Sequence, residues 1–160
     1  GTFDKQKISL FGKGGSTTLV SIGVGDFNED MIQDVIVLYV SETYQVGLTF
    51  GYNDGTFGPP IKLNLKIQFM FSYPLTITDF NNDGLLDIVT TTYNPSTLNI
   101  YFGDGNGNFE LYTAFSSEAL NYYTYIATVN FNDDNYPDIF FVSEIGVYVL
   151  LNTGQCDNNI

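Results

Sequence analysis

The chain has 160 residues, of which 44 % are hydrophobic and 16 % aromatic, so it can bury the core of one ordinary domain. Its 5 basic and 18 acidic residues give a formal charge of −13, which disfavours contact with nucleic-acid phosphates or anionic lipid surfaces. No apolar run reaches the roughly 18 residues of a membrane-spanning helix, and the first ten residues, GTFDKQKISL, lack a signal-peptide pattern.

The first predicted strand, Ser21 to Phe27, leads into the segment DFNEDMIQD, which has four acids in nine positions. Like charges this close repel each other, so a positive group is expected among them. Strands are then predicted at Asp34 to Val40, Gln45 to Tyr52 and Thr56 to about Leu65, which are rich in β-branched and aromatic residues and separated by turn residues. Pro59-Pro60 falls within the fourth of these strands, which is therefore expected at a sheet edge, and a loop at these prolines is the alternative.

The acidic segment recurs as DFNNDGLLD from Asp79 and as NFNDDNYPD from Asn130, at steps of 53 and 51 residues. A second marker, an aromatic residue after a turn at Phe3, Phe57 and Phe109, recurs at steps of 54 and 52 residues. Two markers with one period indicate repeated supersecondary units. No segment has the apolar period of a helix, and four antiparallel strands per unit predict an all-β fold of β-propeller blades.

Residues 1–160 are therefore predicted to form a single β-propeller repeat region. The predicted parts are the outer strand of a preceding or closing blade at 1–10, blade one at 18–66, blade two at 71–118 and an incomplete blade three at 122–154. Three blades do not comfortably close a ring, because propellers have about 4 to 8. Two interpretations stay open. Either Gly1 marks a fragment boundary and the remaining blades belong to a longer chain, or the N-terminal strand completes the third blade, in cis or across a homo-oligomer in which two chains make six blades.

Each acidic loop has side-chain oxygens at positions 1, 3, 5 and 9 and a backbone carbonyl at position 7. Oxygen ligands without His or Cys suit a hard cation, and Ca2+ accepts such irregular sets more readily than Mg2+ does. We therefore expect up to three Ca2+ sites. The candidate ligands are Asp26, Asn28, Asp30, Ile32 and Asp34 in the first loop, Asp79, Asn81, Asp83, Leu85 and Asp87 in the second, and Asn130, Asn132, Asp134, Tyr136 and Asp138 in the third.

The three loops are not expected to bind Ca2+ equally. The second loop should bind best, because Gly84 stands at its sharp bend. The first loop has Met31 at the same position, which adds strain. The third loop has Asn130 in place of the first Asp, so it has one carboxylate fewer and should be the weakest site. An EF-hand is excluded because no loop has Glu at its twelfth position. Metal-free turns, closed by Asp and Asn side chains, are the alternative.

The loops DFNEDMIQDVIV, DFNNDGLLDIVT and NFNDDNYPDIFF, followed by FGYNDGTF and FGDGNGNF, resemble the FG-GAP or VCBS repeat family. That family includes the calcium-binding blades of integrin α-chain propellers. The resemblance implies Ca2+ ligands at the loop positions given above and an extracellular or surface-exposed protein. It also implies blade-packing roles for Phe50, Gly51, Phe57, Phe102, Gly103 and Phe109.

We do not expect an enzyme, because the clustered Asp residues are accounted for by cation binding and the chain has no His, nucleophile elbow or phosphate loop. The leading hypothesis is a calcium-binding module for extracellular adhesion or recognition of a protein or glycan ligand. A lectin-like propeller is the alternative, since tyrosines such as Tyr122, Tyr123 and Tyr125 can stack on sugars where they are exposed; packing between blades is the other interpretation of these rings. The non-catalytic part of a secreted carbohydrate-active or phospholipase-type enzyme, and a structural spacer, are further alternatives.

Overall fold

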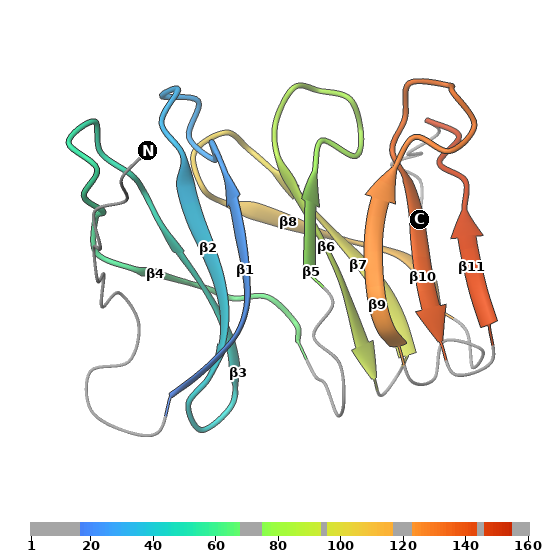
Figure 1. Ribbon diagram of the computed structural model, residues 1–160, viewed down its shortest axis with the longest axis horizontal. Helices are drawn as coiled ribbons and strands as arrows, with labels where there is room; N and C mark the ends of the chain where they lie inside the picture. The colour runs from blue at the N-terminus through green and yellow to red at the C-terminus, as the bar shows by residue number, and fades with distance from the viewer. Residues whose placement is uncertain (1–16, 68–74, 94–95, 117–122, 144–145, 155–160) are drawn as a thin grey trace, which may run out of the picture.

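The computed structural model describes residues 17–67, 75–93, 96–116, 123–143 and 146–154, which form three antiparallel sheets (Figure 1). The first sheet contains β1 (Thr18–Gly25), β2 (Asp34–Val40), β3 (Tyr44–Thr49) and β4 (Ile61–Leu63). The second contains β5 (Leu75–Thr78), β6 (Asp87–Tyr93), β7 (Ser96–Gly103) and β8 (Phe109–Ser116). The third contains β9 (Tyr123–Val129), β10 (Asp138–Ser143) and β11 (Gly146–Leu150). Strands adjacent in sequence are neighbours in each sheet.

The all-β prediction is confirmed, and the described residues contain no helix, hence none long and apolar enough to cross a bilayer. The propeller ring itself stays a prediction, because the three sheets are open. The strand expected at residues 1–10 lies outside the described residues, as does Tyr122.

The fourth strand of the first unit is shorter than predicted. It covers Ile61–Leu63 rather than Thr56 to Leu65, and an isolated bridge joins Phe57 to Gly51 before it. Pro59 and Pro60 therefore precede the strand instead of lying within it, because neither has an N–H to donate to β3. The strand does form the edge of its sheet, as expected.

The first strands of the three sheets lie side by side, because β5 contacts both β1 and β9 (Figure 1). The contact of β1 with the second sheet is close: a Cβ at Gly23 would overlap the Ile77 side chain on β5, and one at Gly25 would overlap Leu86 in the second acidic loop. Between β5 and β9, the hydroxyl oxygens of Thr76 and Thr128 are 3.3 Å apart and share a hydrogen bond. Small residues on the first strands thus let adjacent sheets approach.

Two hydrophobic clusters hold the three sheets together. In the first, Ile36 and Leu48 of the first sheet pack with Ile88 of the second sheet. In the second, Ile100 of the second sheet packs with Phe141 of the third sheet. Burial of these large apolar side chains stabilises the stack, at about 25 cal/mol for each Å² removed from water. The second sheet therefore contributes one face to each cluster.

Candidate metal centres in the three acidic loops

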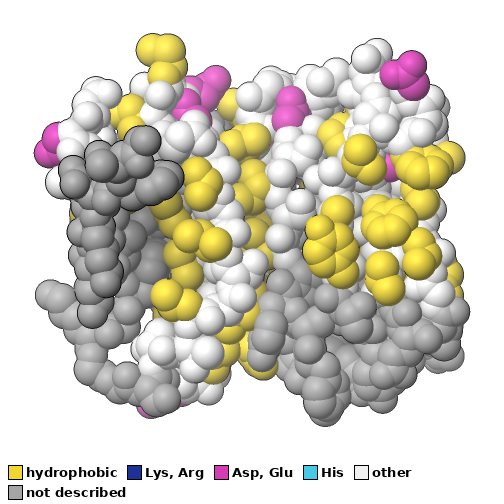
Figure 2. Space-filling model, in the orientation of Figure 1, with side chains coloured by type: hydrophobic (Ala, Val, Ile, Leu, Met, Phe, Trp, Pro, Cys, Tyr) yellow, Lys and Arg dark blue, Asp and Glu magenta, His cyan; other side chains and the backbone are white. Residues whose placement is uncertain are grey.

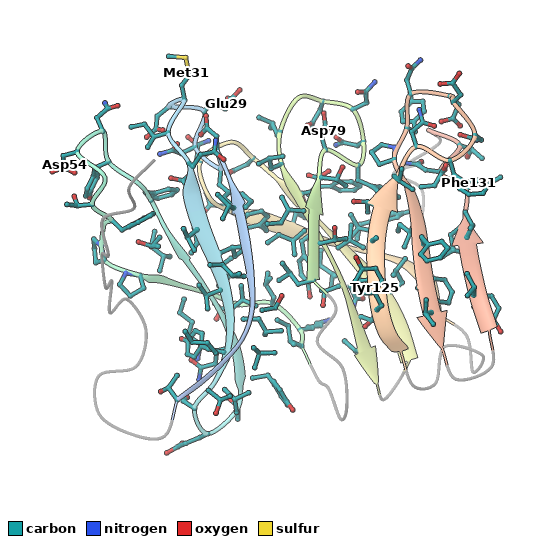
Figure 3. All side chains as sticks on the ribbon, viewed as in Figure 1. Glu29, Met31, Asp54, Asp79, Tyr125 and Phe131 are labelled. Atoms are coloured by element: carbon teal, nitrogen blue, oxygen red, sulfur yellow. The ribbon has the colours of Figure 1, made fainter. Side chains whose placement is uncertain are left out.

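The three acidic loops connect the first strand to the second strand of each sheet. Because the sheets share one strand order and orientation, the loops project from the same edge of the stack (Figure 1). Figure 3 shows Glu29 and Met31 on the first loop, Asp79 on the second and Phe131 on the third. Acidic side chains gather along this edge in the space-filling view (Figure 2).

The residue at position 1 closes each loop by accepting backbone N–H groups. Asp26 Oδ1 accepts the N–H of Asp30 at 3.2 Å, and its Oδ2 accepts the N–H of Met31 at 2.7 Å. Asp79 accepts the two equivalent N–H groups at 3.1 and 2.8 Å. Asn130 has one amide oxygen in place of two carboxylate oxygens, and it accepts the N–H of Asp134 at 3.3 Å. The third loop is therefore closed less firmly at this position.

The residues at positions 3 and 5 are joined in the same way in all three loops. Asn28 Nδ2 donates to Asp30 Oδ2 at 2.9 Å, and Asp30 Oδ1 accepts the N–H of Ile32 at 2.8 Å. Asn28 Oδ1 and Asp26 Oδ1 both accept the Asp30 N–H at 3.2 Å, so these two oxygens lie near each other. The Asn-to-Asp bond recurs at 2.8 Å in the second and third loops. Carboxylate and amide oxygens keep a second lone pair for a further ligand.

Two residues in each loop have the left-handed backbone conformation. The bend expected at position 6 is present, with φ of 66° at Met31, 89° at Gly84 and 73° at Asn135. Position 4 also has positive φ, at Glu29, Asn82 and Asp133, which the sequence analysis missed. Asn and Asp adopt positive φ more readily than most residues, so Asn82 and Asp133 were the sequence signal for this conformation at position 4.

The carboxylate at position 9 connects three strands of its sheet. Asp34 is fully buried; its Oδ2 accepts the N–H of Phe27 at 2.9 Å and its Oδ1 accepts the N–H of Gly51 at 2.8 Å. These bonds join the end of β1, the start of β2 and the residues after β3. Asp87 makes the equivalent bonds at 2.7 and 2.9 Å, and Asp138 does so at 2.7 and 2.8 Å. Sequence reasoning predicted these residues as cation ligands and missed this structural role.

The residue that donates to Oδ1 at position 9 is Gly in the first two sheets. A Cβ at Gly51 would clash with the Gln33 carbonyl oxygen, and a Cβ at Gly103 would clash with that of Leu86. The third sheet has Asn152 instead, whose Nδ2 donates to the equivalent carbonyl, that of Pro137, at 3.3 Å. The recurring Gly after an aromatic residue was the sequence signal for this close approach.

Burial makes the second loop's position-9 carboxylate electrostatically unfavourable. The pKa of Asp87 is raised to about 6: burial raises it most, the N–H groups of Gly103 and Phe80 partly oppose this, and the nearby Asp83 and Asp79 add to the rise. Burial likewise raises the pKa of Asp34. A cation close to these carboxylates would offset both the loss of solvent and the repulsion.

The oxygen atoms of each loop are of the chemical types that bind Ca2+. Among the described residues, no three acidic, His or Cys side chains are grouped closely enough to form a metal site by themselves. Amide and backbone carbonyl oxygens would therefore have to complete the shell, as Ca2+ permits with its about 6 to 8 oxygen ligands. The atoms available to bind Ca2+ are the side-chain oxygens at positions 1, 3 and 5, the carbonyl oxygen at position 7 and the second lone pairs of the position-9 carboxylate.

The FG-GAP-like repeat family matches the chain at residues 26–90 and 79–141. Together the two matches span residues 26–141, which is 116 of the 160 residues. Each match begins at the first residue of an acidic loop and ends in the second strand of the following sheet. Comparisons with curated proteins and with solved structures gave no match.

Proposed function

Because the chain belongs to the FG-GAP-like repeat family, we propose that its three sheets are blades of a β-propeller-type ligand-binding module whose acidic loops bind Ca2+. The observation that carries this proposal is one hydrogen-bonded loop built three times at one edge of the sheets. The proposed role is binding rather than catalysis, since the same Asp residues that a catalytic carboxylate pair would need are engaged in the loops.

The loop residues would act together in this module. Bound Ca2+ would supply positive charge among carboxylates that otherwise repel each other. Asp26, Asn28 and Asp30 would hold it through oxygens that already lie on one turn. Asp34 then links that turn to Phe27 and Gly51, so ordering of the loop also holds the ends of β1, β2 and β3 in place.

Thermal unfolding in EDTA and in Ca2+ tests the metal proposal. With free Ca2+ about 100-fold above the dissociation constant, each filled site adds about 2.7 kcal/mol to the free energy of unfolding. A chain of this size then gains roughly 5 to 11 °C in Tm per site, at about 2 to 4 °C for each kcal/mol. Mg2+ at the same concentration should give a smaller shift, because it demands stricter octahedral geometry.

Asp54→Ala provides a matched control for loop variants such as Asp83→Ala. Asp54 is an exposed turn residue outside the three loops, and it accepts bonds from Thr56 at 2.9 and 2.6 Å. Its loss should leave the Ca2+-dependent shift unchanged, whereas Asp83→Ala should reduce it. Identical melts of the wild-type chain in EDTA and Ca2+ would mean that the loops are metal-free turns closed by their own hydrogen bonds.

We propose that the ligand is an extracellular protein, recognised by the loops at the edges of the blades. Millimolar extracellular Ca2+ fills even weak loop sites, which fits a module whose third loop is closed less firmly. The exposed ring of Tyr125 on β9 favours a glycan as the second candidate (Figure 3). A glycan-array signal in Ca2+ that disappears in Tyr125→Ala would select the glycan, and its absence would leave the protein ligand.

A further inference from the structure

Asn152 connects the second acidic loop to the third. It follows β11 at the end of the third sheet and is only 8 % exposed. Its side-chain Nδ2 donates to the carbonyl oxygen of Phe80 in the second loop at 2.8 Å. Its backbone N–H donates to Asp138 Oδ1 in the third loop, also at 2.8 Å. One buried residue therefore holds a group in each of two neighbouring loops.

Two further hydrogen bonds fix the orientation of the Asn152 amide. Its Nδ2 also donates to the carbonyl oxygen of Pro137 in the third loop at 3.3 Å, and its Oδ1 accepts the N–H of Gly154 at 3.0 Å. An amide nitrogen has two hydrogens to donate, and here both are directed at backbone carbonyls of different loops. A shift of the third loop would therefore move the donor that holds the Phe80 carbonyl.

The Phe80 peptide lies among the candidate Ca2+ ligands of the second loop. Phe80 is at position 2, between the candidate ligands at positions 1 and 3, and its N–H donates to Asp87 Oδ2 at 2.7 Å. A chain of hydrogen bonds thus runs from Asp87 through Phe80 and Asn152 to Asp138. This chain begins and ends at the position-9 carboxylates of two loops.

The first and second loops are connected differently. Gly103 is the equivalent of Asn152 in the second sheet, because its N–H donates to Asp87 Oδ1 at 2.9 Å, but it has no side chain to reach the Phe27 carbonyl. Apolar packing joins the sheets at this place: the rings of Phe27 and Phe109 lie edge-on, with centroids 6.0 Å apart. A single side chain therefore distinguishes the two loop pairs.

We propose that Asn152 is a positioning residue that couples Ca2+ binding in the second loop to Ca2+ binding in the third, while the first loop binds independently. This inference rests on the proposed Ca2+ binding. An ion in one loop orders the backbone of that loop, and Asn152 extends this order to the other loop, so the next ion has less to order and binds more tightly. Coupling between sites typically changes affinity by about 5- to 150-fold, and it acts equally in both directions. The less firmly closed third loop then fills together with the second.

A Ca2+ titration followed by the amide resonance of Gly84 measures binding in the second loop, because the Gly84 N–H donates to Asp79 at 2.8 Å. Asp134→Ala removes the position-5 carboxylate of the third loop, and Asp30→Ala removes that of the first. The two variants are matched, since the first and third sheets both contact the second. Asp134→Ala should raise the dissociation constant of the second loop about 5-fold or more, and Asp30→Ala less than about 2-fold.

Asn152→Gly distinguishes coupling from a purely structural role. Gly is the residue found here in the first two sheets, so the variant keeps the N–H that donates to Asp138 and loses only the side chain. In this background Asp134→Ala should change the dissociation constant of the second loop by less than about 2-fold. A role in stability alone would lower the Tm and leave the full effect of Asp134→Ala. The exposed Asn106→Ala is the control and should keep that full effect.

Reciprocity provides a second measurement that needs no change at Asn152. Asp83→Ala in the second loop should weaken binding in the third loop, followed by the Tyr136 amide, by the factor that Asp134→Ala causes in the second. Equal effects of the two position-5 variants would overturn the coupling, as would an undiminished effect of Asp134→Ala in Asn152→Gly; both outcomes leave Ca2+ binding itself intact. Amide resonances that do not respond to Ca2+ in either loop would instead reject the calcium proposal, and this inference with it.

Discussion

Substitution of Gly103 by Ala tests how tightly the acidic loop and the third strand of the second sheet fit together. The Gly103 N–H donates to Asp87 Oδ1 at 2.9 Å, and an added Cβ would clash with the carbonyl oxygen of Leu86. Both groups are fixed, since Leu86 is in the loop backbone and Asp87 also accepts the N–H of Phe80 at 2.7 Å. The chain must therefore move away from the loop to admit the methyl group.

The expected cost combines two contributions. Forcing a methyl group into a packed site costs about 1 to 3 kcal/mol. Weakening a hydrogen bond to a buried charged acceptor costs about another 1.5 to 3 kcal/mol. We expect Gly103→Ala to lower the free energy of unfolding by about 2.5 to 6 kcal/mol, a large share of the roughly 5 to 15 kcal/mol that stabilises a typical domain.

Gly55→Ala is the control for the general effect of replacing Gly. Gly55 has φ of 78°, and a Cβ there would meet no atom within 4 Å. Its substitution should therefore cost only the strain of a left-handed Ala, about 1 to 2 kcal/mol. Urea unfolding followed by circular dichroism in EDTA compares the two variants without any contribution from Ca2+. Equal losses for Gly103→Ala and Gly55→Ala would refute the close-approach argument.

Two further predictions concern the loops and the contact between sheets. Asp83→Ala should lose more Ca2+-dependent stability than Asn130→Ala. The reason is that two hydrogen bonds to Asp79 close the second loop at position 1, whereas one longer hydrogen bond to Asn130 closes the third. Equal losses in calorimetry would contradict this ranking. Asn152→Ala should lower the free energy of unfolding by about 1 to 3 kcal/mol, because Asn152 Nδ2 donates to the Phe80 carbonyl at 2.8 Å across two sheets. The exposed Asn106→Ala is its control, and a matching urea midpoint for both would count against that contact.

Much of the local structure follows from the sequence. Strand β2 covers Asp34–Val40 as predicted, because an apolar β-branched run begins directly after the acidic loop. The bend at Gly84 was expected from the residue without a Cβ, and its φ of 89° agrees. The fourth strand was predicted too long, since Pro59 and Pro60 removed the N–H groups that its first half needed.

The sequence by itself determined the repeat, the all-β class, the family and the acidic loops with their candidate oxygen ligands. These features depend on residue type and on spacing along the chain, which are visible without coordinates. Tertiary structure decided that Asp34 accepts the N–H of Gly51, 17 residues away, and that Phe131 is exposed where Phe27 and Phe80 are buried. Such outcomes depend on which strands pack against each other, because burial and hydrogen-bond partners belong to the assembled sheets and not to any one segment.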